Sequence, residues 1–167
     1  MEKNKNVSER YDEIILRRAK TTDLDQIAEI ENLSFIEPYS KELLLMLILS
    51  VAIFLVAEYH KKIVGYICAS IEIYDGPCGH IISIAVHPNY RRKGIGSALI
   101  KELINRLKKI DIKMVYLECR VSNEAAIEFY KKHGFEIKER VPHYYSNSED
   151  AYIMIKRFDD QINEGHI

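Results

Sequence analysis

The sequence predicts a single α/β domain with a mixed, mostly antiparallel central sheet. Stretches rich in β-branched residues alternate with stretches whose apolar residues recur every three to four positions, as strands and helices do. The 167 residues are 47% hydrophobic, which is enough to bury one substantial core. No internal repeat or low-complexity segment is present. We therefore expect about seven strands flanked by about four helices.

Capping and turn residues place the elements of the first half of the chain. Thr21 or Thr22 can cap a helix, which should end before Phe35 because Pro38 lies in the segment that follows. Ser40 can cap the next helix. The expected elements are a strand over 13–18, a helix ending before 35, a helix over 41–49, and hairpin strands over 52–59 and 63–74.

The second half begins with the stretch around which the chain is organised. A β-branched run over 81–86 indicates a buried strand, which stops before Pro88 because proline cannot donate to a sheet ladder. Gly134 is placed to end a later helix. The expected elements are a strand over 80–86, a long helix from 95, a strand over 114–120, a helix from 122–123 to 132, and strands over 135–141 and 151–157.

The ends of the chain differ from its centre in composition. Residues 1–12 are polar and are expected to be flexible, and the tail over 158–167 is also polar. The α/β domain is therefore expected over 13–157.

Composition excludes several classes of function. A formal net charge of -1 gives no general attraction for nucleic acid or an anionic membrane. The longest apolar run, over 43–56, is too short to span a bilayer, and no signal peptide is visible. Three cysteines without metal-ligand spacing indicate reduced thiols. We expect a cytoplasmic protein, a monomer or weak homodimer, that binds no nucleic acid, membrane or metal.

A basic turn between the central strand and the long helix indicates an anion site. Arg91, Gly94 and Gly96 form an Arg-x-x-Gly-x-Gly pattern directly before a helix N-terminus, whose free N–H groups can bind a phosphate. Gly96 is not followed by the Lys-Ser/Thr of a P-loop, and Leu99 stands where a dinucleotide fingerprint needs glycine. A basic turn that only starts a surface helix is the alternative.

This pattern resembles the pyrophosphate loop of the GCN5-related N-acetyltransferase (GNAT) family, whose members bind acetyl-CoA. The order of the expected elements is also that of the family, so the resemblance covers roughly residues 13–157. It implies the GNAT fold and acetyl-CoA as cofactor, with CoA as product and no metal. The cofactor-binding residues that it implies are Ile84, Ala85, Val86, Arg91, Arg92, Lys93, Gly94, Ile95, Gly96, Ser97, Asn123 and Tyr130.

A second motif, over 117–135, is similar to the family's strand-Asn-helix-Tyr-x-x-x-Gly-Phe segment. Asn123 and Tyr130 lie seven residues apart and so share one helix face. In the family, the asparagine contacts the cofactor and the tyrosine protonates the departing thiolate. A phenol suits this task because its reference pKa is near 10. The alternatives are a helix cap for Asn123 and a packing residue for Tyr130.

Two further residues are implied to handle the proton of the substrate amine. Glu118 stands in Leu-Glu-Cys-Arg, which resembles the Leu-Glu-Val-Arg of the RimI-like enzymes, where the glutamate is the proposed general base. His80 stands in a Gly-His-Ile-Ile-Ser run similar to that of the NatA-type enzymes and their archaeal relatives, where the histidine lies near the amine. The alternatives are an ion pair of Glu118 with Arg120 or another residue, and a histidine that only starts a strand.

Two segments resemble the substrate-binding parts of these enzymes. The loop over 31–40 carries Phe35, Glu37 and Tyr39 and combines features of the RimI-like and NatA-type loops, which leaves the preferred first residue open. The segment over 143–154 carries Tyr144 and Tyr145, which are similar to the tyrosines that clamp the substrate's first residues.

The resemblance implies direct transfer of an acetyl group to the N-terminal α-amino group of a protein or peptide, such as a ribosomal protein or a nascent chain. Two alternatives remain at this point. One is an acetyltransferase for lysine or for a small amine such as a polyamine or an antibiotic. The other is a catalytically silent module that binds acetyl-CoA.

Overall fold

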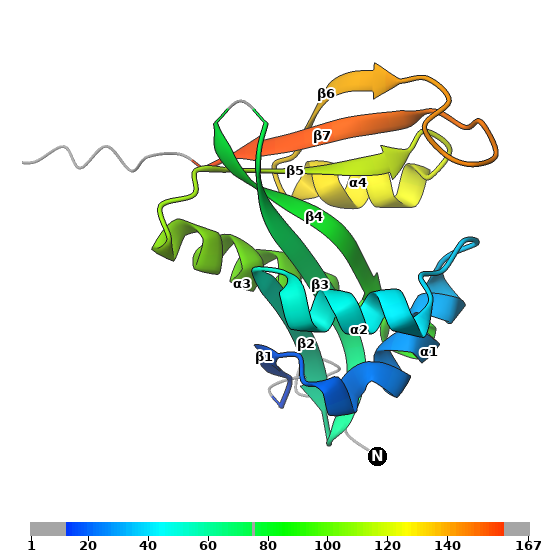
Figure 1. The fold of residues 1–167 in the computed structure, drawn as a ribbon, viewed down its shortest axis with the longest axis vertical. Coiled ribbons are helices and arrows are strands. Elements are labelled where there is room, and N and C mark those ends of the chain that lie inside the picture. Colours follow the sequence, from blue (N-terminus) through cyan, green and yellow to red (C-terminus); the bar gives the residue numbers. More distant parts are fainter. Residues whose placement is uncertain (1–12, 75, 159–167) are drawn as a thin grey trace, which may run out of the picture. The chain divides into compact units, whose positions relative to one another are not determined.

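The computed structural model describes residues 13–74 and 76–158 (Figure 1). The expectation for residues 1–12 lies outside this part of the chain, as does that for the tail beyond Phe158. Phe158 itself is 8% exposed, and its N–H donates to the carbonyl of Lys113 at 2.7 Å. The last strand is therefore followed by one more anchored residue, which the composition of the tail did not indicate.

The element order is that of the predicted α/β class. Within the described residues, seven strands form one hydrogen-bonded sheet in the order β1-β2-β3-β4-β5-β7-β6. β1 pairs with β2, and β7 with both β5 and β6, in antiparallel fashion, whereas β4 and β5 are parallel. The elements are β1 (Ile15–Arg18), η2 (Thr21–Asp23), α1 (Leu24–Ser34), α2 (Lys41–Ser50), β2 (Ile53–Tyr59), β3 (Lys62–Ile73), β4 (Pro77–Val86), η3 (Pro88–Tyr90), α3 (Ile95–Lys109), β5 (Met114–Arg120), α4 (Glu124–Lys132), β6 (Glu136–Val141) and β7 (Ala151–Arg157).

The described residues group into two compact units. The first unit holds residues 13–68 and 83–102, and the second holds residues 69–74, 76–82 and 103–158. The first unit therefore contains β1, β2, α1, α2 and the start of α3, and the second contains β5, β6, β7 and α4.

In the first unit, a short turn tied to an ion-pair cluster precedes the first helix. The chain makes a short 3-10 turn, η2, before α1 begins at Leu24, and Asp23 accepts a hydrogen bond from the backbone N–H of Lys20 at 2.8 Å. Arg17 binds the Asp23 carboxylate at 2.8 Å and Glu58 at 2.7 Å. The predicted threonine cap is therefore wrong, because both threonines lie inside this turn and Asp23, which makes no side-chain capping bond to α1, holds the N-cap position.

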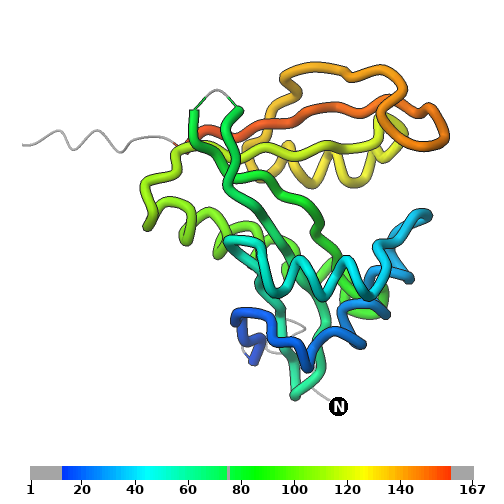
Figure 2. Tube along the Cα trace, viewed as in Figure 1, coloured from blue at the N-terminus to red at the C-terminus, as the bar shows by residue number. Residues whose placement is uncertain are grey.

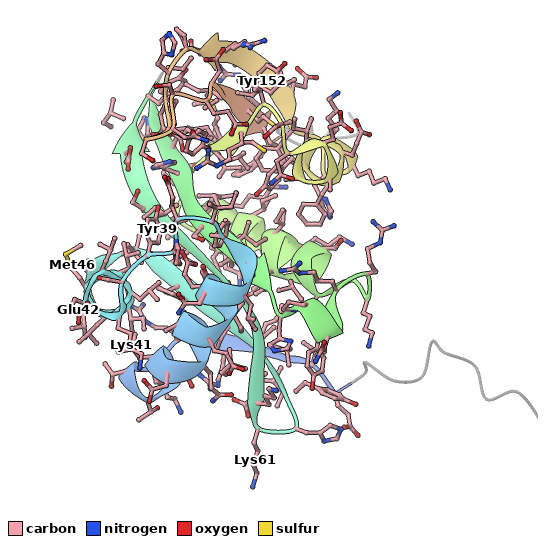
Figure 3. All side chains as sticks on the ribbon, turned by 90° about the vertical axis from the view of Figure 1, so that its right-hand side faces the viewer. Tyr39, Lys41, Glu42, Met46, Lys61 and Tyr152 are labelled. Carbon is pink, nitrogen blue, oxygen red and sulfur yellow. The ribbon has the colours of Figure 1, made fainter. Side chains whose placement is uncertain are left out.

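The second helix of the first unit follows its prediction. The hydroxyl of Ser40 accepts the N–H of Leu43 at 3.3 Å and so caps α2. Leu44 and Ile48 are buried on its inner face, whereas Met46 is 53% exposed and projects outward (Figure 3). Helix α2 thus buries one face, while its outward face also carries apolar side chains, Met46 and the 67% exposed Leu49.

In the second unit, α4 runs along the strands β5, β7 and β6 (Figure 2). Gly79 of β4 permits close packing of α3, because a Cβ there would lie 2.7 Å from a methyl group of Leu107. Cys78 packs with Met114, Tyr116 and Ile153 in a buried cluster. This cluster supports the strand positions from which the polar side chains described below project.

Candidate functional site

The predicted phosphate loop has the local geometry of an anion site. The first hydrogen bond of α3 runs from the N–H of Ala98 to the carbonyl of Gly94 at 3.0 Å, so the N–H groups of residues 95–97 precede the helical ladder. Gly94 has a φ of 80° and Arg92 a φ of 62°, the left-handed region. These two residues turn the chain so that the helix begins directly after the basic segment.

Two basic side chains of this loop make contacts with other residues of the first unit. Arg91 donates from Nε to the carbonyl of Val86 at 2.9 Å and from Nη2 to the hydroxyl of Ser34 at 3.1 Å. Lys93 lies over the ring of Tyr90, at 5.7 Å from its centroid. Arg91 therefore braces the loop through its side chain.

The strand before the loop alternates between buried and half-buried residues. Ala85 is buried, while Ile84 and Val86 lie on the half-buried face. Gly65 of β3 allows this strand to lie close, because a Cβ there would be 3.1 Å from the carbonyl oxygen of Ala85. The predicted cofactor-contacting strand is thus packed on one face and more accessible on the other.

A buried carboxylate that the sequence did not single out anchors the predicted substrate loop. Glu31 is 1% exposed and accepts the backbone N–H of Tyr39 at 2.9 Å. Its other oxygen accepts the hydroxyl of Tyr66, which also lies 2.8 Å from the hydroxyl of Ser83. Burial, followed by the charge of Glu31, raises the pKa of Tyr66 well above its usual value. Tyr66 is therefore a neutral hydrogen-bond donor to this carboxylate.

The loop itself exposes side chains to solvent. Phe35 is 39% exposed, and Glu37 is also on the surface. Tyr39 is half-buried, and Figure 3 places it just before α2. The three predicted substrate residues of this loop thus all belong to the first unit, and the Glu31 carboxylate holds the backbone of one of them, Tyr39.

In the second unit, the two residues predicted to handle the amine proton meet. Nε2 of His80 lies 2.7 Å from Oε2 of Glu118, and the two side chains are 18% and 17% exposed. Glu118 therefore pairs with His80, while Arg120 binds Glu149 at 3.0 Å instead. The alternation of β5 explains this arrangement, because Glu118 lies on its half-buried face between the buried residues Leu117 and Cys119.

A second carboxylate, also missed from the sequence, completes this cluster. Glu72 of β3 lies 3.0 Å from Nδ1 of His80 and accepts the hydroxyl of Tyr116 at 2.7 Å. Hydrogen bonds from Ser70, then Tyr116 and His80, lower the pKa of Glu72 to about 2. Glu72 sits in a β-rich stretch whose partners are distant in sequence, so no local signal could have identified it.

Tyr130 is held by the end of its own helix. The N–H of Phe135 donates to the carbonyl of Tyr130 and that of Gly134 to Lys131, both at 3.0 Å, which is the Schellman pattern expected for a stop at glycine. The Tyr130 and Phe135 rings lie 5.7 Å apart. Burial, then the charges of Cys119 and Tyr145, raises the pKa of Tyr130 well above its usual value. The hydroxyl is therefore protonated at neutral pH.

Asn123 caps the helix that carries Tyr130. Its Oδ1 accepts the N–H of Ala126 at 3.2 Å, so the structural alternative for this residue is observed. The cap uses the side-chain oxygen and not the side-chain NH2 group. Its predicted contact with the cofactor stays a prediction.

The tyrosine segment before β7 is fixed by a salt bridge. The Arg120 guanidinium lies 3.8 Å from the ring centroid of Tyr145 and binds Glu149, whose side chain also accepts the N–H of Ser122 at 3.1 Å. Tyr144 is 47% exposed and meets Tyr145 edge to face. Glu149 thus organises this segment, which leaves Tyr144 as its exposed aromatic residue.

The thiol of Cys119 is not activated. Burial, then the charge of Glu149, raises its pKa to about 11. A thiol with this pKa is almost entirely protonated at neutral pH and is a poor nucleophile. Cys119 therefore lacks the activation that a nucleophilic cysteine needs.

Two kinds of feature are absent from residues 13–74 and 76–158. No three His, Cys, Asp or Glu side chains in these ranges are grouped so that they could hold a metal ion. Within the same ranges, every helix is too short or too polar to cross a bilayer.

Comparison with known proteins identifies the family. A sequence model described as the acetyltransferase (GNAT) family matches residues 24–135. The chain belongs to this family. The seven-stranded mixed sheet and four α-helices of the part that the structure describes form the GNAT fold, as the sequence predicts.

Several GNAT proteins are similar over most of this chain. An N-alpha-acetyltransferase of Sulfurisphaera tokodaii is 41% identical over 150 residues, which are 83% of this chain and 90% of the relative. The crystal structure of Ard1 from Thermoplasma volcanium superposes with a TM-score of 0.83 at 32% identity, over 89% of this chain and 99% of that one. Arabidopsis thaliana Naa50, in complex with the bisubstrate analogue CoA-Ac-MVNAL, gives a TM-score of 0.77 at 29% identity, over 87% and 99%.

Proposed function

We propose that this GNAT protein transfers the acetyl group of acetyl-CoA to the N-terminal α-amino group of proteins or peptides. The observation that carries the proposal is the contact between Glu118 and His80 at 2.7 Å, in the unit that also holds Tyr130. These three groups can remove a proton from an amine and donate a proton to a leaving group. The names of the similar N-alpha-acetyltransferase and of the Naa50 complex support the choice of substrate.

The loop over 91–97 fits the pyrophosphate of acetyl-CoA. The N–H groups that precede the ladder of α3 are donors for an anion, and Arg92 and Lys93 add positive charge. Gly94 at a φ of 80° keeps space open, because no atom lies within 4 Å of where its Cβ would stand. We assign Arg91 the role of bracing this loop, and the backbone of Ile84, Ala85 and Val86 that of binding the pantetheine arm. When bound, acetyl-CoA supplies an acetyl thioester whose carbonyl carbon is the electrophile.

Side chains of the second unit then carry out the proton transfers. The neutral amine attacks, and Glu118 takes the proton that the nitrogen must lose as its new bond to carbon forms. Tyr130 donates its proton to the thiolate. Its raised pKa keeps the hydroxyl protonated before the reaction.

An α-amine suits such a site better than a lysine. The free energy needed to reach the neutral amine at pH 7 is roughly 1–1.4 kcal/mol for an α-amino group and about 4.6 kcal/mol for lysine, at 1.36 kcal/mol per pKa unit. A single carboxylate base suits the α-amino group, which needs less free energy to become neutral. We therefore favour nascent or ribosomal protein N-termini as substrates, with Phe35, Glu37 and Tyr39 shaping the pocket for the first residue and Tyr144 and Tyr145 binding the peptide.

The test is mass-resolved acetylation of paired peptides by the purified chain with acetyl-CoA. One set begins with a free Met, Ser, Ala or Glu and carries an internal lysine, and the other has the same sequences with blocked N-termini. We expect label only on the free α-amine, and the ranking of first residues reports the specificity of the loop over 31–40. The Glu118→Gln variant is the matched inactive control, because it keeps the size of the side chain and removes its basicity.

Other outcomes would identify the alternatives. Label on blocked peptides would make the protein a lysine acetyltransferase. Binding of acetyl-CoA without label on either set would favour a small amine or a silent binding module. A polyamine substrate has little support in the second unit, because Glu149 and Asp150 are paired with Arg120 and Arg140.

A further inference from the structure

His80 is fixed on both edges and on one face. Its Nε2 lies 2.7 Å from Glu118 Oε2, and its Nδ1 lies 3.0 Å from Glu72 Oε1. The ring stacks on that of Tyr116, with centroids 4.5 Å apart and planes within 5°. Tyr116 in turn donates its hydroxyl to Oε2 of Glu72 at 2.7 Å, which orients this carboxylate toward the imidazole.

Two carboxylates on one imidazole favour the charged ring. A neutral imidazole has one N–H and one lone pair, so either tautomer would direct a lone pair at a carboxylate oxygen within 3.0 Å. The imidazolium donates to both oxygens and forms two charge-assisted hydrogen bonds. Burial alone lowers the pKa of His80, but the hydrogen bonds and charges of Glu118 and Glu72 outweigh it and raise the pKa.

We propose that Glu72 is a positioning residue of the acetyl transfer, which holds His80 as a cation with both ring nitrogens engaged, so that Glu118 is the base. This inference rests on the proposed function and deepens it. A histidine without a free lone pair cannot accept the amine proton, whereas a carboxylate has a second oxygen and further lone pairs.

The charges explain why a second carboxylate is useful. Before the reaction, Glu72, His80 and Glu118 carry a sum of one negative charge. The amine N–H bond breaks, an O–H bond forms on Glu118, and the sum becomes zero. His80 then retains Glu72 as a charged partner, so its cation, 18% exposed, is not left unpaired when Glu118 becomes neutral.

The other ionisable groups around the ring do not replace Glu72. Tyr116 and Tyr144 both have a raised pKa, through burial first and then through the charges of Glu72 and Glu118, so both are neutral. Burial, with a smaller contribution from Glu72, also raises the pKa of Cys78. Farther out, Lys138 lies over the ring of Tyr74, which stacks on Tyr116.

The first test is an NMR titration of the full chain labelled in its six histidines, with the His80 signal assigned from the His80→Gln variant. In the wild type, we expect His80 to titrate above its reference value of 6.5. In Glu72→Gln, which keeps an acceptor oxygen but loses the charge, the midpoint should fall by about one pH unit. Tyr116→Phe, which keeps the stacked ring, should lower it less. Glu139→Gln on the exposed strand β6 is the matched control and should change nothing.

The second test is the pH profile of kcat/KM for a free N-terminal peptide. If the active form contains the His80 cation, activity falls as pH rises through its pKa. Glu72→Gln should move this alkaline fall to lower pH by the amount seen in NMR and lower kcat, with the affinity for acetyl-CoA unchanged.

Several results would overturn the inference. It is wrong if the His80 midpoint lies below 6.5 in the wild type or does not respond to Glu72→Gln. It is also wrong if neither limb of the profile moves, as for a merely structural residue, or if the acidic limb moves instead, since neutral His80 would then be the base. A wild type that acetylates no peptide would refute the proposed function, and the NMR titration would still decide the charge of His80.

Discussion

The hydroxyl of Tyr130 is protonated at neutral pH, and its ring packs at the end of its own helix. The Schellman bonds fix its backbone and Phe135 packs against its ring, while burial raises its pKa. Tyr130→Phe removes the proton donor and keeps the packing. We expect kcat to fall by about 10²–10⁴-fold with little change in acetyl-CoA affinity, measured by steady-state kinetics and calorimetry.

Tyr59→Phe, on β2 in the first unit, is the control for this prediction and should keep wild-type turnover. If Tyr130→Phe also keeps it, the thiolate is protonated by another group, and Tyr130 is only a packing residue.

The lowered pKa of Glu72 predicts how the stability of the fold changes at acid pH. Its pKa is about 2 in the folded chain and 4.5 when unperturbed, so its contribution to stability is complete above 4.5 and is lost as pH falls toward 2. Thermal melts should show that Glu72→Gln loses less stability than the wild type between pH 5 and pH 2. The difference should be about 1 kcal/mol or less, because Glu72 is 43% exposed and solvent screens its charge. Parallel curves would show that Glu72 gains nothing from its partners.

The contribution of His80 to stability depends on pH in the opposite direction. Its pKa is raised, so its stabilising contribution is complete below 6.5 and is lost as pH rises through the folded value. The cluster thus contributes to stability in full at mildly acid pH, between the ranges in which Glu72 and His80 titrate.

At the scale of elements, two substitutions of Gly94 in the phosphate loop distinguish the effect of backbone strain from the effect of charge. Gly94→Ala adds a Cβ that meets no atom within 4 Å, at a φ of 80° that costs an L-residue about 1–2 kcal/mol. Gly94→Glu adds the same strain plus bulk and a negative charge. By isothermal titration calorimetry, we expect acetyl-CoA to bind the alanine variant with at most a modest loss and the glutamate variant at least about 100-fold more weakly. Equal binding by both variants would show that the pyrophosphate lies elsewhere.

The helix boundaries agree with the predictions from sequence where a single capping or stop residue sets the boundary. Ser40 caps α2, and Gly134 ends α4 with a φ of 81°, both as predicted. The start of α1 was missed because Asp23 competes with the two threonines, and Arg17 holds it through a contact six residues away. Strand β1 begins at Ile15 and not at residue 13, and β4 begins at Pro77, three residues earlier than expected.

For the whole molecule, cofactor binding should stabilise the fold by mass action. A ligand at 100 times its Kd adds about 2.7 kcal/mol to the free energy of unfolding. For a chain of 167 residues, this should raise Tm by about 5–10 °C. Differential scanning fluorimetry with acetyl-CoA measures the shift, and an unchanged Tm at saturating acetyl-CoA would contradict the cofactor assignment. Gly94→Glu is the control, and at the same acetyl-CoA concentration it should show a much smaller shift.

The sequence alone determined the class of fold, the family and most of the candidate residues. These depend on patterns that are local: β-branched runs, helical periodicity, a glycine-punctuated basic turn, and the Asn123–Tyr130 spacing on one helix. Such patterns can be read from the sequence because residues close together in the chain constrain each other's backbone conformation and share one buried face.

Only the tertiary structure decided which polar side chains meet. Glu72 and Glu118 are 46 positions apart in the chain, and strand pairing alone brings both to His80. Glu31 likewise reaches Tyr66 and the backbone of Tyr39 through packing of α1 in the first unit. Hydrogen bonds depend on distances of a few ångströms between groups remote in sequence, and no local pattern of residues encodes those distances.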